Sequence, residues 1–158
     1  MKNTKRNIFE LKFKPDTVFL AVAISMWGAT LIIPSFDAPL LMRALIGILL
    51  ALVGMGIVLV AGALFYRART TVEPTQPHTT STLVVSGLYG ITRNPMYVGM
   101  TLILLGLATL LLNWVSYLLV IVFVAYIWRF QIIPEERALY GLFHDEYASY
   151  TSRTRRWL

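Results

Sequence analysis

The sequence predicts an all-α integral membrane protein with four transmembrane helices in two antiparallel hairpins and a C-terminal amphipathic helix on the membrane interface. Hydrophobic residues make up 57% of its 158 residues, whereas soluble domains contain roughly 45–50%. They gather in four long runs, and only 14% of the residues are charged. We expect one structural unit, in which residues 1–66 form a basic segment and the first hairpin. Residues 67–158 then form a cytoplasmic loop, the second hairpin and the C-terminal helix.

The four apolar runs have the lengths of membrane-spanning helices. The first covers residues 17–34 and the second residues 40–66, and both reach the roughly 17–25 residues that a spanning helix needs. The third and fourth, residues 96–112 and 114–130, are shorter and are separated only by Asn113. Because a single helix across both would be too long for the bilayer, we expect a tight helical hairpin there.

The basic residues indicate an orientation. The connection between the first two runs contains Asp37, with Arg43 just inside the second run, and the turn at Asn113 is uncharged. The positive-inside rule therefore places both termini and the central loop in the cytoplasm. We expect a multi-pass protein of a prokaryotic cytoplasmic membrane. The basic residues on the expected cytoplasmic side are Lys2, Lys5, Arg6, Lys12, Lys14, Arg67, Arg69, Arg93, Arg129, Arg137, Arg153, Arg155 and Arg156.

Two helix starts can be predicted from local sequence. Asp16 is expected to be the N-cap of the first helix. Asn94 is expected to cap the third helix, with Pro95 at the first helical position, where its missing N–H costs nothing. The free N–H groups of that helix start and the adjacent Arg93 suit a carboxylate or a phosphate.

The central loop, residues 67–94, is long, and loops of this length are usually functional or disordered. Its apolar residues 83–85 should anchor it against the membrane face. Gly87 and Gly90 allow backbone angles that other residues resist.

The C-terminal segment begins at Pro134, which should end or kink the fourth helix. Glu135 and Glu136 then fall in the first turn of a new helix, where acids are favoured. Apolar residues recur at helical spacing over residues 139–150, which indicates an amphipathic helix on the interface. Taken alone, the basic residues and tryptophan at 153–157 indicate a contact with anionic lipid.

Several kinds of site are unsupported. The chain has no cysteine, which excludes disulfides, thiolate metal sites and a cysteine nucleophile. No glycine-rich nucleotide-binding motif is present. His78 and His144 occur without a metal-binding pattern, so we predict no metal site. We also predict no nucleic-acid partner. Gly54 and Gly56, within the second run, indicate a close-packing helix surface.

Two motifs together resemble the isoprenylcysteine carboxyl methyltransferase family, to which the phospholipid N-methyltransferases look related. The resemblance covers about residue 70 to the end. The first motif is Gly87-x-Tyr89-x-x-x-Arg93-Asn94-Pro95-Met96-Tyr97-x-Gly99, followed by a helical hairpin. The second is Glu135-Glu136-x-x-Leu139-x-x-x-Phe143-x-x-x-Tyr147-x-x-Tyr150, followed by Arg155-Arg156-Trp157-Leu158.

The resemblance implies an integral membrane enzyme that uses S-adenosylmethionine and takes a lipophilic substrate from the bilayer. The acceptor could be a prenylcysteine-like carboxylate, a lipid amine or a small thiol or acid. The sequence differs from the family at Gly90, where a basic residue is common, at His144, where relatives carry glycine, and at Asn94, where many carry histidine. The implied cofactor-binding residues are His78, Leu83, Val84, Gly87, Tyr89, Arg93, Asn94, Pro95, Tyr97, Glu135 and Glu136.

The roles of these residues are hypotheses. Arg93 and the helix start suit the carboxylate of the methyl donor, and a glutamate suits its amino group or a ribose hydroxyl. Tyr89 and Tyr97 can stack on adenine or lie against the sulfonium. An amine or thiol acceptor must lose a proton, which Glu135, Glu136 or His78 could accept. The catalytic candidates are Glu135, Glu136 and Arg129, the last of which could hold an anionic acceptor.

Two other functions are compatible with parts of the sequence. Membrane reductases that use NADPH on sterol-like double bonds look similar around the loop and hairpin, but they usually have more helices. A non-enzymatic membrane protein whose basic faces bind lipid or a partner would explain everything except the paired motifs. The sequence leaves open the acceptor, the oligomeric state, the use of a general base and the glutamate that contacts the cofactor.

Overall fold

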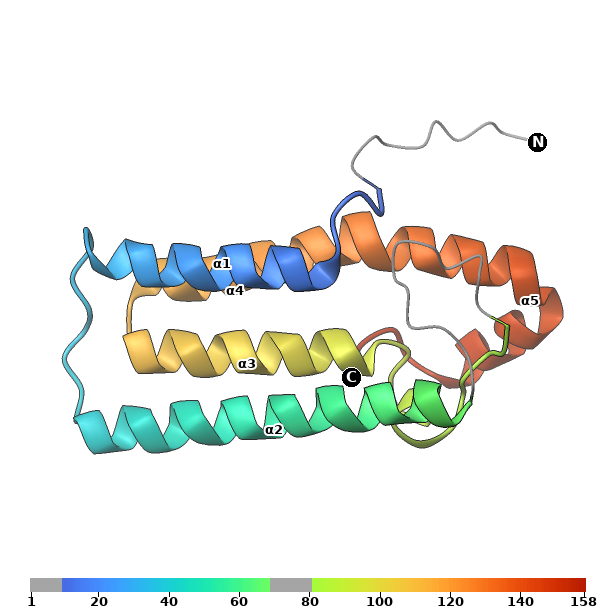
Figure 1. Cartoon of the computed structure of the whole chain (residues 1–158), viewed down its shortest axis with the longest axis horizontal. Helices are drawn as coiled ribbons and strands as arrows, with labels where there is room; N and C mark the ends of the chain where they lie inside the picture. The colour runs from blue at the N-terminus through green and yellow to red at the C-terminus, as the bar shows by residue number, and fades with distance from the viewer. Residues whose placement is uncertain (1–9, 69–80) are drawn as a thin grey trace.

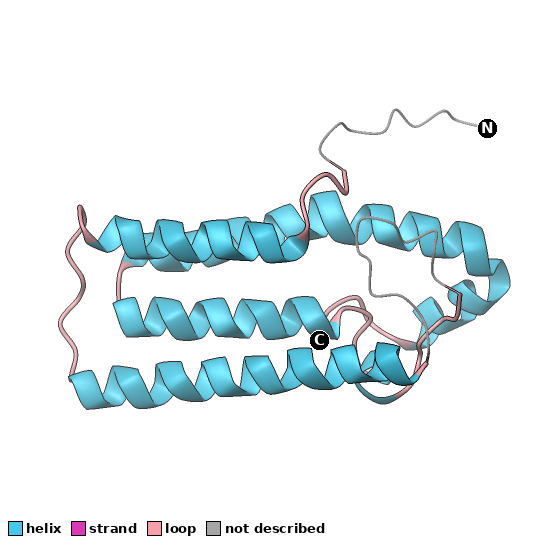
Figure 2. Ribbon diagram, in the orientation of Figure 1, coloured by secondary structure: helices cyan, strands magenta, loops and turns pink. Residues whose placement is uncertain are grey.

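The computed structural model describes residues 10–68 and 81–158, and within these ranges the chain is helical with no strand (Figure 2). The long helices are α1 (Pro15–Thr30), α2 (Leu40–Arg67), α3 (Pro95–Leu111) and α4 (Trp114–Ile127). Two short turns, the 3-10 turn η2 (Gly87–Gly90) and the π-helical turn η3 (Trp128–Ile132), precede α3 and the C-terminal helix α5 (Ile133–Arg153), respectively.

The long helices run side by side in alternating directions (Figure 1). The turns that join α1 to α2 and α3 to α4 lie together at one end, where the Phe36 N–H donates to the Leu112 carbonyl at 2.8 Å. Leu112 has φ 49°, and buried Asn113 caps α4 by accepting from the Val115 N–H. The Asn113 amide also donates to the Ile33 carbonyl at 2.8 Å. The predicted turn at Asn113 is thus confirmed.

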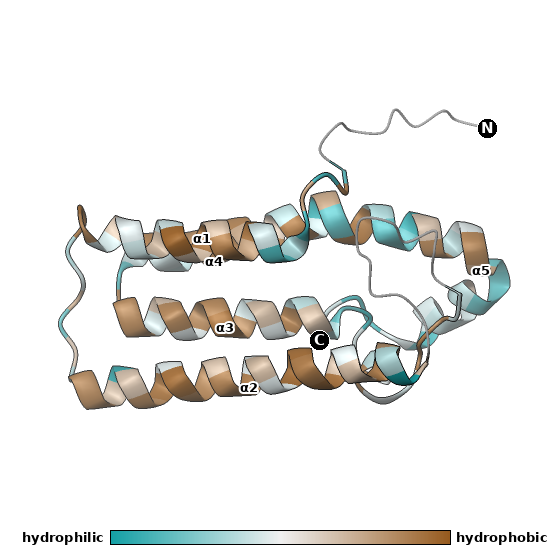
Figure 3. Cartoon of the chain, in the orientation of Figure 1, coloured by the Kyte–Doolittle hydropathy of each residue, from teal (hydrophilic) through white to brown (hydrophobic). Residues whose placement is uncertain are grey.

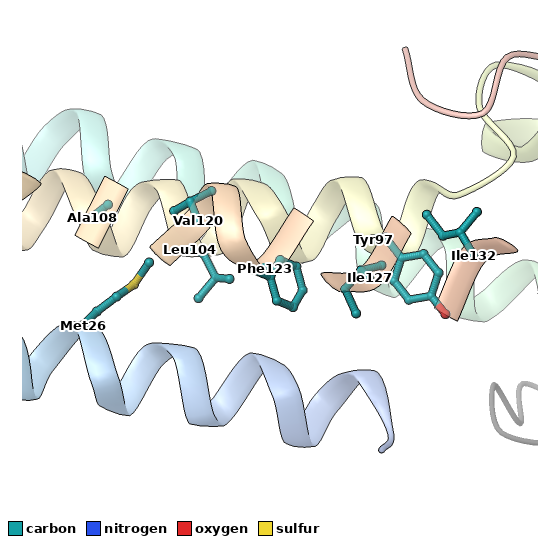
Figure 4. Close-up of a cluster of buried hydrophobic side chains, with 8 residues drawn as sticks. All are labelled: Met26, Tyr97, Leu104, Ala108, Val120, Phe123, Ile127 and Ile132. Atoms are coloured by element: carbon teal, nitrogen blue, oxygen red, sulfur yellow. The ribbon is translucent and has the colours of Figure 1, made fainter. Parts of the chain in front are cut away.

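Hydrophobic residues dominate the long helices (Figure 3). Large apolar side chains are found both buried in the bundle and exposed on its surface. Within the described residues, α2 and the continuous helix Trp114–Arg153 are long and apolar enough to cross a membrane, and α3 is a shorter apolar helix. The outer face of α2 exposes many large aliphatic side chains. A buried cluster joins α1, α3 and α4, and its members are Met26, Tyr97, Leu104, Ala108, Val120, Phe123, Ile127 and Ile132 (Figure 4).

Glycines bring α2 and α3 into backbone contact. A Cβ added to Gly54 would lie 2.5 Å from the Gly99 carbonyl oxygen, and one added to Gly106 would lie 2.5 Å from the Gly47 carbonyl oxygen. Helices that approach this closely need small residues at the contact. The predicted close-packing surface is therefore confirmed at Gly54. It is wrong at Gly56, where an added Cβ would meet nothing within 4 Å.

One predicted helix boundary is wrong, and of the two outcomes predicted at Pro134, an end or a kink, the end is excluded. The N-cap of α1 is Lys14, since Pro15 already begins the helix and places Asp16 in the first turn. The fourth helix does not end at Pro134. It passes through the π-helical turn, in which the Ile133 N–H donates to the Trp128 carbonyl, and continues as α5. The extra residue in that turn lets the chain pass the proline without a break.

Candidate active site

The segment before α3 is shaped by a glycine and a buried tyrosine. Gly87 has φ 61°, which a glycine adopts without steric cost. The turn that follows buries Tyr89 against Val84 and Ala61. The Tyr89 ring also meets Phe65 of α2 edge-on, with ring centroids 5.2 Å apart. These contacts anchor the end of the central loop on α2 through Val84, whereas an anchor of residues 83–85 on the membrane face stays a prediction.

Helix α3 begins at the predicted residues, but the predicted side-chain cap is absent. Asn94 is the N-cap residue and Pro95 is the first helical residue, yet the Asn94 side chain does not cap the helix. Its amide donates instead to the Arg156 carbonyl at 2.8 Å. The first turn of α3 therefore has no side-chain cap for its N–H groups, and these groups carry the positive end of the helix dipole.

The C-terminal tail lies against this helix start. The Arg93 N–H donates to the Arg155 carbonyl at 2.9 Å, and Thr92 and Arg155 form an isolated bridge. The Thr92 hydroxyl donates to the Arg156 carbonyl at 3.2 Å. Three consecutive residues before α3 thus bind the tail through its backbone, which places the Arg156 side chain beside Arg93.

Both arginines meet one carboxylate. Arg93 lies 3.2 Å from Glu136 Oε1, and Arg156 lies 2.6 Å from Oε2. The Arg156 Nε also donates to Oε1 at 2.9 Å, so the pair is bidentate. The Glu136 side chain is 17% exposed and that of Arg93 is 15% exposed. Such charge-assisted bonds are stronger than neutral ones, and they hold three separate parts of the chain together.

The neighbouring acid has different partners. Glu135 Oε1 accepts from the Tyr97 hydroxyl and from the Gln131 amide, each at 2.7 Å. Removal from water raises the pKa of Glu135 to about 7, against the lowering effect of these two hydrogen bonds. The negative charge of Glu136 adds to the rise. Near neutral pH, Glu135 can therefore exchange a proton.

A kink in α5 completes the site. His144 has φ 38° and ψ −110° inside the helix, a conformation that disfavours side chains with a Cβ. A glycine would adopt this geometry at lower cost. Beyond the kink the helix returns to the start of α3, where the Tyr150 hydroxyl donates to the Tyr89 carbonyl at 2.7 Å. Tyr147 is also buried there, 6.1 Å from Tyr150 between ring centroids.

The site retains capacity for an anion. The Arg93 Nε is buried and has no hydrogen-bond partner among the described residues. It lies at the uncapped N-terminus of α3, whose N–H groups favour negative charge. A carboxylate could satisfy both, so the residues present fit the anionic end of an amino-acid-like ligand.

The structure brings most of the predicted site residues together. Leu83 is half-buried beside Val84. His78 lies outside the described residues. Arg129 does not join the group, because it pairs with Glu10 at 3.1 Å and lies over the Phe130 ring. The predicted residues that gather at the start of α3 and α5 are Val84, Gly87, Tyr89, Arg93, Asn94, Pro95, Tyr97, Glu135 and Glu136.

Sequence reasoning missed several members of the site. The basic segment 153–157, taken alone, predicts a lipid contact for Arg156, although this residue also belongs to the second motif. Gln131 precedes Glu135 by four residues, a helical spacing that predicts contact. No local signal indicates Thr92 or the Tyr150 hydroxyl as partners of distant carbonyls. In the described part of the chain, no three histidine or acidic side chains gather to hold a metal.

Comparisons with known proteins bear on the family of this chain. The chain is 44% identical over 63 residues to an uncharacterized protein of Haemophilus influenzae; the match covers 40% of this chain and all of that protein. No solved structure matches. The profile of the family described as phospholipid methyltransferase matches residues 42–146, more than half of the chain. Together with its apolar helices, this match identifies the chain as a membrane methyltransferase that belongs to the phospholipid methyltransferase family.

Proposed function

We propose that this protein transfers a methyl group from S-adenosylmethionine to a lipophilic or membrane-embedded acceptor. One observation carries the proposal. The two motifs are far apart in sequence but share a set of direct contacts, Arg93 with Glu136 at 3.2 Å and Tyr97 with Glu135 at 2.7 Å. These contacts form at an uncapped helix start beside an unpartnered guanidinium nitrogen.

The residues at this point suit a zwitterionic methyl donor. S-Adenosylmethionine supplies a methyl group that is already activated on a sulfonium. Arg93 and the N–H groups of α3 would hold its carboxylate. The two hydrogen bonds to Glu135 from described residues both end on Oε1, so Oε2 can accept a hydrogen bond from a ribose hydroxyl of the donor. Tyr97 and Tyr89 are packed inside apolar clusters, so we assign them support of the site and not stacking on an adenine or a sulfonium. Orientation of the reactants can lower the barrier by about 7–11 kcal/mol at best.

The two acids are suited to different tasks. Glu136 is held by two guanidinium groups through charge-assisted hydrogen bonds, which fix its position. Glu135 has a pKa raised to about 7 and could accept a proton from an amine or thiol acceptor. A carboxylate acceptor would need no base. We therefore assign proton transfer to Glu135 and structural support of Arg93 to Glu136.

The arrangement of the helices supports an acceptor from the bilayer. We propose that α1 to α4 span the membrane and that the start of α3 and the whole of α5 lie at its cytoplasmic face. The starts of α1 and α3 share one end of the bundle with α5 (Figure 1), as the positive-inside rule requires of both termini. The site would then lie where a lipophilic acceptor could present a polar end to it.

Binding of S-adenosylhomocysteine to the purified protein tests the donor. We expect saturable binding by calorimetry, and we expect Arg93→Ala to weaken it at least tenfold, because the variant loses the carboxylate partner. Arg153→Ala is the matched control, since Arg153 is exposed and, among the described residues, binds the Ser149 carbonyl of its own helix. Unchanged affinity in Arg93→Ala would remove Arg93 from the site. Thermal stabilisation by NADPH but not by S-adenosylhomocysteine would favour a reductase, and no binding of either would favour a non-enzymatic protein.

A labelling experiment identifies the acceptor class. The protein is incubated with methyl-labelled S-adenosylmethionine and a total lipid extract, and the labelled products are identified. We expect label in a lipophilic product, and we expect Glu135→Gln to slow transfer to an amine or thiol more than transfer to a carboxylate. Equal slowing for all acceptors would contradict a base role for Glu135.

A further inference from the structure

The outer face of the α4–α5 junction binds the N-terminal segment. Pro134 has no N–H, so the Phe130 carbonyl, four residues earlier, lacks its usual helical donor. The Leu11 N–H donates to that carbonyl at 3.1 Å. Leu11 adopts φ 57° to do so, which is uncommon for a residue with a Cβ. The N-terminal segment thus replaces a hydrogen bond that the proline removes from the helix.

An ion-pair network reinforces this contact. Glu10 Oε1 lies 3.1 Å from Arg129, and its Oε2 lies 3.2 Å from Arg137. The Glu10 side chain is only 7% exposed, whereas each arginine is 47% exposed. One carboxylate therefore joins a residue before Pro134 to a residue after it, across the π-helical turn.

The inner face of the same turn carries the acid of the methyl-donor site. Gln131 and Glu135 both lie between Arg129 and Arg137 in sequence, and Gln131 donates to Glu135 at 2.7 Å. Any slip of the turn would change the direction of both side chains relative to Tyr97. We infer that Glu10 and Leu11, the N-terminal strap, are positioning residues that hold Gln131 and Glu135 in register for the methyl donor. This inference rests on the proposed function.

The test compares Glu10→Gln with Asp16→Asn, which removes the same charge from a nearby exposed position. We expect Glu10→Gln to weaken binding of S-adenosylhomocysteine about tenfold and Asp16→Asn to change it less than twofold. Glu10→Asp, which keeps the charge, should recover most of the affinity. Hydrogen exchange without ligand should be faster at the amides of residues 131–137 in Glu10→Gln. Wild-type affinity in Glu10→Gln would overturn the inference, whatever its exchange.

A double variant separates the strap from direct catalysis by Arg129. If the two residues act together, the double variant Glu10→Gln/Arg129→Gln should bind S-adenosylhomocysteine almost as well as Glu10→Gln alone. If the losses of affinity from the two substitutions simply add, the inference is overturned, and binding of the acceptor becomes the better role for Arg129. If the wild-type protein binds no S-adenosylhomocysteine, the proposed function fails. The exchange measurement then decides by itself whether Glu10 holds the turn.

Discussion

Helix α3 is held in two contrasting ways. Along its length it meets α2 backbone to backbone, through Gly99 and Gly106 opposite Gly54 and Gly47. At its start it meets α5 and the tail through a group of hydrogen bonds and ion pairs. The first contact depends on the absence of side chains and admits no small adjustment. The second depends on charged and polar side chains, which can exchange a partner in the protein for a group of a bound ligand.

The largest effect should come from filling the glycine contact. Gly54→Ala places a Cβ 2.5 Å from the Gly99 carbonyl oxygen, and overpacking of this kind costs about 3 kcal/mol. Gly56→Ala is the control, because its Cβ would meet nothing within 4 Å. It should stabilise the helix by up to about 1 kcal/mol. Denaturation in detergent measures both, and equal stabilities would contradict a backbone contact between α2 and α3.

A smaller effect should come from the polar contact. Glu136→Gln removes the charge shared by Arg93 and Arg156, and loss of hydrogen bonds to charged groups costs about 2 kcal/mol. Because these groups are partly exposed, water should recover some of that cost. Hydrogen exchange should localise the change to the tail and the start of α3. A stability equal to that of the wild type would show that the tail is held by its backbone bonds alone.

The smallest effect should come from the kink that closes the polar end. His144→Gly relieves a backbone conformation that costs about 1–2 kcal/mol for residues with a Cβ, and the greater flexibility of glycine in the unfolded chain offsets part of the gain. We expect a net stabilisation of about 0.5–1 kcal/mol. Asp145→Gly, at the next position, should instead destabilise by about 0.5–1 kcal/mol. Destabilisation by both substitutions would argue against a kink at His144.

The sequence determined the features that depend on neighbouring residues. Helix positions follow from apolar runs, the turn at Asn113 follows from a single polar break, and the start of α3 follows from Asn94 and Pro95. These predictions succeed because their physical causes, hydrophobicity and backbone preference, act over a few residues. That the two motifs would meet was implied by the family resemblance, and not by any local preference.

The tertiary structure decided which distant groups pair. The chain has 14 basic and eight acidic residues, and local sequence cannot assign Arg156 to Glu136 or Arg129 to Glu10. Nor could it show that Asn94 would bond to the tail instead of capping its own helix. Such choices depend on where the chain returns after kinks at residues such as His144. An ion pair forms only between groups that the whole fold brings within a few ångströms, and that proximity is a property of the assembled bundle.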